Sequence, residues 1–164
     1  MKTMKPALRK FVLTAHVTFA VGWLGAVAAF LALAIAGLTS EDVQLVQSAY
    51  LTMDLITRFV IVPLSFAPLI TGPLLSLFTP WGLFRHYWIL VKLLITILST
   101  LILLVHLQPI GLLADAASGG TFPRADLHGM QVQMVVASAA ALLALLVATG
   151  LGVYKPKGET PWGA

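Results

Sequence analysis

The fold is decided by the stretch from Phe11 to Leu38, which reads FVLTAHVTFAVGWLGAVAAFLALAIAGL and contains no Asp, Glu, Lys or Arg. A helix that spans a bilayer needs about 20 mostly apolar residues. The apolar region of a cleaved signal peptide has only about 7–15 residues. The stretch is therefore predicted to be a first spanning helix, although basic residues precede it as they precede a signal peptide.

The composition of the whole chain agrees with a membrane protein. Its 164 residues are 59% hydrophobic and 10% charged, with a net charge of +4, whereas soluble domains carry about 25% charged residues. This excludes a soluble enzyme, a nucleic-acid-binding module and a disordered tail, so we expect a lipid bilayer and no nucleic acid as partner. The absence of cysteine excludes disulfides, iron–sulfur clusters and thiolate metal sites.

Three further apolar runs follow, and together with the first they predict an all-α membrane protein, a single domain over residues 1–164 forming a four-transmembrane-helix bundle. The predicted helices cover about residues 11–38, 41–78, 87–107 and 125–154. Ser40 is the expected N-cap of the second helix, and three prolines should kink that helix. Gln108 and Pro109 should close the third helix, leaving residues 114–124 as a loop.

The basic residues predict the orientation of the bundle, because cytoplasmic loops of membrane proteins are enriched in Lys and Arg. With a cytoplasmic amino terminus, the inner side holds seven of them: Lys2, Lys5, Arg9, Lys10, Arg85, Lys155 and Lys157. The outer loops hold Arg124 and most of the acidic residues. Both termini are therefore expected in the cytoplasm, in the inner membrane of a bacterium.

Polar residues inside the spans are predicted at two depths. His16 and Lys92 should lie in the inner leaflet, and His106 and His128 near the outer side. Lys92, Thr96, Ser99, Leu103 and His106 follow a +4, +3, +4, +3 spacing, which is one face of a helix. This face should point into the bundle, because lipid does not accept polar side chains. Intramembrane polar residues are functional candidates by default.

Small residues recur on the fourth helix at Ala140, Ala144, Ala148 and Gly152. Such a stripe is typical of close helix packing. It would also leave room for a flat cofactor, so both interpretations stay open.

The histidines favour haem b, one or two per chain, because a chain without cysteine must hold iron through His, Met, Lys or Tyr. His106 and His128, on consecutive helices, are the predicted axial pair, and His16 with Lys92 forms a second candidate site. Arg58, and also Arg124, could pair with propionates, and Gln131 could bond a ligand. Each histidine could instead be a structural residue that bonds a neighbouring helix.

A resemblance adds to this hypothesis. His16, Trp23 and Gly25 on the first helix, together with the segment Tyr87-Trp88-Ile89-Leu90-Val91-Lys92-Leu93-Leu94, resemble the HemJ-type protoporphyrinogen oxidases. The resemblance implies that haem b is bound, with Trp23 near it, and that His16 and Lys92 are the functional, catalytic residues. The pattern from His16 to Gly25 also looks like the CopD-type copper-resistance membrane domain, and the whole chain is similar to a family of small integral membrane proteins of unknown function.

The leading hypothesis is thus a haem b protein of the inner membrane that acts in electron transfer or as a haem-dependent oxidoreductase. The alternatives are a HemJ-like protoporphyrinogen oxidase, a small transporter or copper-uptake component, and a structural subunit of a membrane complex. Quinone, porphyrin or a redox protein are the expected partners, and a homo-oligomer is compatible with the sequence.

Overall fold

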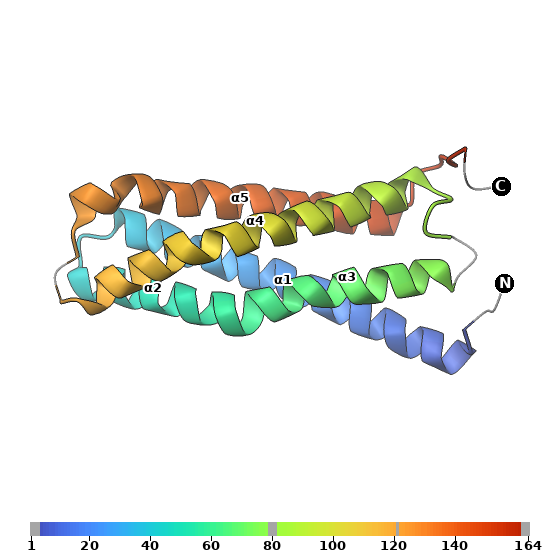
Figure 1. Ribbon diagram of the computed structural model, residues 1–164, viewed down its shortest axis with the longest axis horizontal. Coiled ribbons are helices and arrows are strands. Elements are labelled where there is room, and N and C mark those ends of the chain that lie inside the picture. The colour runs from blue at the N-terminus through green and yellow to red at the C-terminus, as the bar shows by residue number, and fades with distance from the viewer. Residues whose placement is uncertain (1–3, 79–81, 121, 162–164) are drawn as a thin grey trace.

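Four long helical spans run side by side along the molecule (Figure 1). The computed structural model describes residues 4–78, 82–120 and 122–161; Lys2 lies outside them. The spans are α1 (Pro6–Thr39), the continuous α2 (Val43–Ile56), η1 (Thr57–Ile61) and α3 (Val62–Leu77), then α4 (Tyr87–Ser118) and α5 (Arg124–Tyr154). Each span is long and apolar enough to cross a membrane. Within the described residues, this confirms the predicted all-helical bundle with four helices long and apolar enough to span a membrane.

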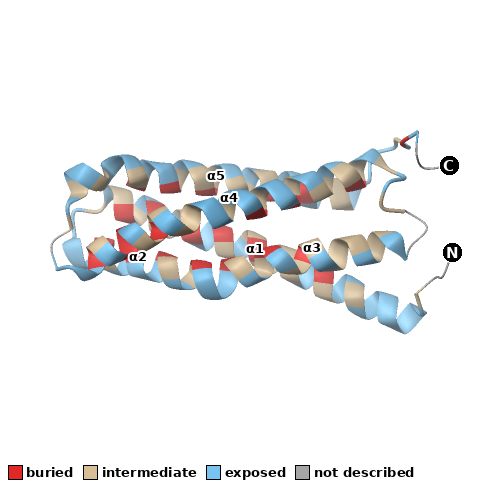
Figure 2. Cartoon of the chain, viewed as in Figure 1, coloured by how far each residue is buried: buried red, intermediate tan, exposed pale blue. Residues whose placement is uncertain are grey.

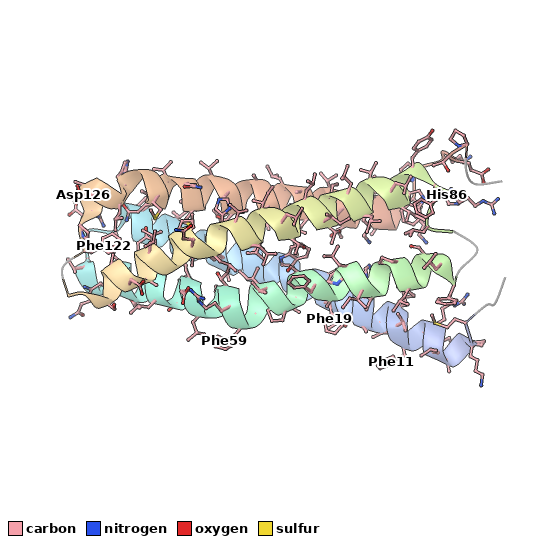
Figure 3. All side chains as sticks on the ribbon, in the orientation of Figure 1. Phe11, Phe19, Phe59, His86, Phe122 and Asp126 are labelled. Atoms are coloured by element: carbon pink, nitrogen blue, oxygen red, sulfur yellow. The ribbon has the colours of Figure 1, made fainter. Side chains whose placement is uncertain are left out.

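Large apolar side chains point outward from the bundle. Phe11 is 70% exposed and Phe59 is 75% exposed, and Figure 3 shows both projecting away from the helices. Soluble monomers rarely expose contiguous apolar patches of more than a few hundred Å². The outer surface of this bundle therefore suits contact with lipid chains.

The predicted end of the third helix at Leu107 is wrong, because α4 continues through Pro109 to Ser118. A proline inside a helix removes one backbone donor and strains the preceding turn. In this stretch, however, Ile110, Leu113 and Ala117 are buried in the core cluster. Burial of these side chains outweighs one lost hydrogen bond, so residues 114–118 are helical instead of forming the expected loop.

The predicted N-cap at Ser40 is also wrong, because Asp42 caps α2. The Asp42 carboxylate accepts hydrogen bonds from the backbone N–H groups of Gln44 and Leu45, at 2.9 Å and 3.5 Å. Ser40 supports this cap: its hydroxyl oxygen accepts a hydrogen bond from the N–H of Asp42 at 3.1 Å.

The second span contains one turn of π-helix, Thr57–Ile61, between α2 and α3. Pro63, two residues after this turn, has no N–H to offer the carbonyl four residues earlier. The N–H of Val62 bonds to the carbonyl of Thr57, five residues back. Beside this proline the hydrogen-bond register thus changes from four residues to five.

The tightest core lies away from the end of the bundle that carries both termini. Tyr50, Met53, Leu113 and Met134 are fully buried there. Toward the termini, α1 has no buried residue before His16 and α3 has none after Pro68, and red segments are sparse in that half of Figure 2. The bundle is therefore open inside at the end that we call the inner end, where α1 begins and α5 stops.

Candidate functional site

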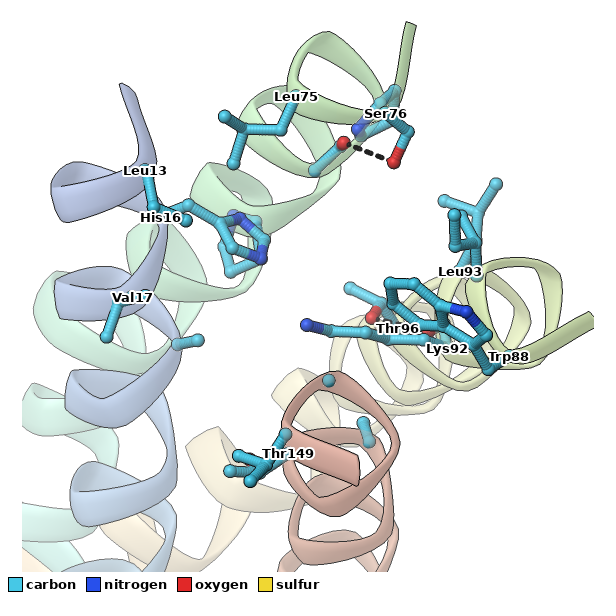
Figure 4. A pocket seen from close by; sticks show the side chains of 18 of the residues that line it. Leu13, His16, Val17, Leu75, Ser76, Trp88, Lys92, Leu93, Thr96 and Thr149 are labelled. Carbon is cyan, nitrogen blue, oxygen red and sulfur yellow. Dashed lines mark hydrogen bonds between the residues drawn. The ribbon is translucent and has the colours of Figure 1, made fainter. Parts of the chain in front are cut away.

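A cavity of about 540 Å³ occupies the inner end, between α1, α3, α4 and α5. Its wall is mostly apolar, and Figure 4 shows His16 and Lys92 reaching into it from different helices. Ligand pockets of proteins are typically about 300–1,000 Å³ and carry a few convergent polar groups on apolar walls. We call this space the inner cavity. Its charged or aromatic polar lining residues are Arg9, His16, Trp23, Trp88, Lys92 and Lys155.

His16 is held in one orientation by α3. Its Nδ1 lies 2.8 Å from the Thr71 hydroxyl oxygen, and that hydroxyl already donates its proton to the carbonyl of Ala67 at 2.8 Å. The contact therefore requires His16 Nδ1 to be the donor, which leaves the lone pair of the neutral ring on Nε2. This is how proteins orient a histidine for metal ligation, with the second ring nitrogen bonded to a fixed partner.

Two glycines make room for the two polar side chains. A Cβ atom on Gly72 would lie 3.3 Å from His16 Cε1, and one on Gly152 would lie 3.0 Å from Lys92 Nζ. Larger residues at these positions would push His16 or Lys92 out of place. Each functional candidate therefore lies directly over a position where the facing helix has no side chain.

Lys92 extends from α4 across the cavity toward the side of α1 (Figure 4). It is close enough to His16 for electrostatic interaction, and among the described residues it forms no ion pair. The structure thus brings together the two residues that the sequence predicts at the inner depth. A histidine lone pair and an amine in one apolar cavity can hold a metal-centred ring, bind a carboxylate or exchange a proton.

A second space of about 370 Å³, the central cavity, lies farther from the termini between α1, η1, α4 and α5. Trp23, which the resemblance associates with haem, lines both cavities and is itself buried. The single polar face predicted on the third helix is confirmed. Its residues Lys92 and Thr96 line the inner cavity, and Ser99, Leu103 and His106 line the central one.

The small residues of the fourth helix also line these spaces. Ala140 and Ala144 border the central cavity, and Ala148 and Gly152 border the inner cavity. The stripe therefore borders both cavities on a helix that also packs against α1 and α4, so it agrees with both interpretations.

His106 and His128, the predicted axial pair, lie at different levels of the bundle. Gln133 lies beside His106, with its amide nitrogen 3.3 Å from His106 Nε2. His128 is five positions away, about 7.5 Å along the helix, is exposed, and lines neither cavity. His106 Nδ1 lies 2.8 Å from the carbonyl of Ile102, so both ring nitrogens of His106 have partners.

The predicted arginine partners of haem propionates are engaged elsewhere. Arg58 forms an ion pair with Asp54, one turn earlier on the same span, with nitrogen–oxygen distances of 2.8 Å and 2.9 Å. Both residues of this pair thus belong to the same span. Arg124 donates to the carbonyl of Ser40.

Gln131, predicted to bond a ligand, is buried in the tight core. Its amide donates to the Tyr50 hydroxyl at 2.9 Å and weakly to the carbonyl of Gly37 at 3.5 Å. Gln131 lines neither cavity. Its role in this structure is to join α1, α2 and α5.

Thr71, Gly72 and Gln133 are site residues that the sequence reasoning missed. Thr71 and Gly72 lie on α3 and face His16 on α1. One sequence signal could have identified them: a hydroxyl and a glycine side by side in a proline-rich apolar helix. Among the described residues, no group of three or more His, Asp or Glu side chains could hold a bare metal ion.

No protein-family model, curated protein or solved structure matches the chain. The residues and geometry of the inner cavity are therefore the basis for a functional assignment.

Proposed function

We propose that this chain is a multi-pass protein of a bacterial inner membrane that binds one b-type haem in the inner cavity and acts in electron transfer or another membrane oxidoreductase step. One observation carries the proposal: His16 lines a largely apolar cavity with Nδ1 bonded to Thr71 and the lone pair on Nε2. Neutral imidazole in this arrangement is a common axial ligand of haem iron. Haem, when bound, would supply one-electron chemistry.

The charges that line the cavity support an anionic ligand. Arg9, Lys92 and Lys155 line it, and its described lining includes no Asp or Glu. Carboxylates, such as the two propionates of haem, form strong charge-assisted hydrogen bonds with such groups. Lys92 would bind or orient a propionate, or hold a proton near the ring, while the apolar walls exclude water.

The orientation of the bundle is part of the same proposal. Arg9 and Arg85 lie near the inner end, and Asp42 and Asp126 lie near the opposite end. In Figure 3 the labels of His86 and Asp126 mark these two ends. Membrane proteins keep excess Lys and Arg in the cytoplasm. The inner cavity would then open toward the cytoplasmic face, with both termini on that side.

The visible spectrum of the purified protein tests the proposal. Protein expressed with added haem should show a Soret band, and a reduced sample should show α and β bands. His16→Ala should abolish these bands, whereas His128→Ala, a matched control outside both cavities, should retain them. Colourless wild-type protein, with no haem in a pyridine extract, would refute the proposal, as would an unchanged spectrum of the His16 variant.

A second candidate function, oxidation of a porphyrinogen as in the HemJ-type enzymes, is favoured by the position of Lys92. The two residues that this resemblance makes functional, His16 and Lys92, line one cavity. Growth of a bacterial strain that lacks protoporphyrinogen oxidase tests it: the wild-type chain should restore growth, and Lys92→Met should not. Failure of the wild-type chain, at a verified level in the membrane, would leave haem binding without this activity.

A further inference from the structure

The inner cavity has an opening in the side of the bundle, between the first half of α1 and the end of α5. Leu13, Val17 and Val21 line the cavity and are also 51%, 50% and 57% exposed on the outer surface. From α5, Val153 lines the cavity and is 71% exposed. Side chains that belong both to a cavity wall and to the outer surface form the rim of an opening, and we call these four residues the lateral rim. Since the outer surface suits lipid, this opening leads into the bilayer.

The course of α1 explains why the opening lies on this side. Away from the termini, α1 and α5 are joined, because the Gln131 amide reaches the carbonyl of Gly37. Toward the termini, α1 runs away from α5 (Figure 1). There it is attached to α3 by the bond between His16 and Thr71. At the level of His16, the side between α1 and α3 is therefore joined, whereas the side between α1 and α5 carries the lateral rim.

The rim is apolar along the helices and basic at its inner end. Arg9 lies one turn before Leu13 on α1, and Lys155 follows Val153 at the end of α5; both basic residues line the cavity. The described lining includes no Asp or Glu. Lys and Arg side chains at a membrane surface attract anionic groups. A ligand that comes from lipid and binds here is therefore expected to be an amphiphile, with an apolar body and acid groups at one edge.

We infer that the ligand of the inner cavity enters from the cytoplasmic leaflet through the lateral rim, apolar edge first, while its acid groups stay beside Arg9 and Lys155. Haem has this form, since its two carboxylates lie on one edge of a flat apolar ring. The inference rests on the proposed function for the ligand and deepens it. The class of ligand is an amphiphile dissolved in the bilayer, and its route to His16 runs sideways through lipid.

The route is tested by obstructing the rim and measuring rates. The probe is protoporphyrin IX, the iron-free ring of haem with the same two carboxylates, added to the haem-free chain in lipid nanodiscs. Its binding is followed by quenching of tryptophan fluorescence, since Trp23 and Trp88 line the cavity. The double variant Val17→Phe, Val153→Phe should slow association about tenfold, because the new side chains must move aside first. Dissociation should slow by the same factor and leave the dissociation constant unchanged, because an equilibrium does not depend on the route.

The matched control is the double variant Val136→Phe, Val147→Phe. These two valines are 61% and 55% exposed on α5 and line neither cavity, so the control should bind the probe at the wild-type rate. The inference is overturned if the rim variant associates as fast as this control, or if the wild-type chain does not bind the probe. It is also overturned if affinity falls with the association rate while dissociation is unchanged, because the two valines would then contact the bound ligand and not its route.

A second pair of variants tests the basic end of the rim. Arg9→Gln should slow association about three- to tenfold at low salt, and less at high salt. Lys10→Gln removes the same charge from the next residue, which does not line the cavity, and should have little effect. Equal effects of the two variants would contradict the position of Arg9 on the route. The haem proposal is tested separately by the spectrum of the His16 variant, because the iron-free probe offers no metal to His16.

Discussion

Gly37 is predicted to be indispensable for the tight core, and alanine is the sharpest probe of it. A Cβ atom there would lie 2.7 Å from Tyr50 Cζ and 2.8 Å from its hydroxyl oxygen. The Tyr50 ring cannot move away easily. It is fully buried, stacks on Phe122 with ring centroids 5.3 Å apart, and its hydroxyl accepts a hydrogen bond from Gln131 at 2.9 Å.

The expected cost of Gly37→Ala combines three effects. Overpacking a filled core costs about 1–3 kcal/mol. Loss or distortion of the bond between Tyr50 and Gln131 adds about 1 kcal/mol. The better helix propensity of alanine returns about 1 kcal/mol. The free energy of unfolding should therefore fall by about 2 kcal/mol.

The assay is reversible unfolding of the purified protein in mixed micelles with increasing denaturing detergent, followed by circular dichroism. Gly25→Ala is the matched control, because it lies on the same helix and a Cβ there would meet no atom within 4 Å. It should be neutral or stabilising by up to about 1 kcal/mol. If the two variants unfold at the same detergent fraction, the packing argument around Tyr50 is wrong.

Three further predictions follow from other contacts. Thr71→Val keeps the shape of the side chain but removes the acceptor of His16 Nδ1; in haem titrations it should weaken binding about 10–100-fold, and an unchanged affinity would deny Thr71 that role. Thr160→Val removes the hydroxyl bond that ties the C-terminal segment to the loop before α4; hydrogen exchange at the N–H of Tyr87, which bonds to Gly158 at 3.3 Å, should become faster, and equal rates would contradict this. Asp54→Asn leaves its arginine partner unpaired and should lower stability by about 0.5 kcal/mol; a stabilised variant in the same unfolding assay would contradict it.

Much of the fold follows from the sequence, because lipid restricts what a helix can expose. The 3.6-residue period of the polar groups on α4 correctly predicted that Lys92, Ser99 and His106 face the interior. This works because the alternative, a polar face in lipid, is far more costly than any packing preference.

The position of a residue along the bundle axis was harder to predict than the direction in which its side chain points. The pairing of His106 with His128 assumed that both lie near helix ends, but α4 runs on to Ser118. His106 is therefore about 18 Å from the end of its helix, whereas His128 is about 6 Å from the start of α5. The sequence signal for an end, Gln108-Pro109, was outweighed by the buried side chains that follow it, and burial cannot be read from one helix alone.

The close contacts between glycines and polar side chains in the site could not be predicted from the sequence either. Gly72 and Gly152 matter because His16 and Lys92 lie over them. Glycines occur in membrane helices for several reasons, so their pattern alone does not say which of them face a functional side chain. Only the register between helices, which depends on tilt and crossing, brings each pair together.

The contrast between the two halves of the bundle links fold to function. In the half away from the termini, Tyr50 fills the space over Gly37 and the helices are joined tightly. In the inner half, Gly72 and Gly152 are covered only by the polar ends of His16 and Lys92, which themselves border open space. A bundle of apolar helices gains dispersion energy by closing such a space. Apolar side chains at these positions would close it. The chain instead keeps two costly polar groups at the wall of a cavity, which is the arrangement expected of a binding site.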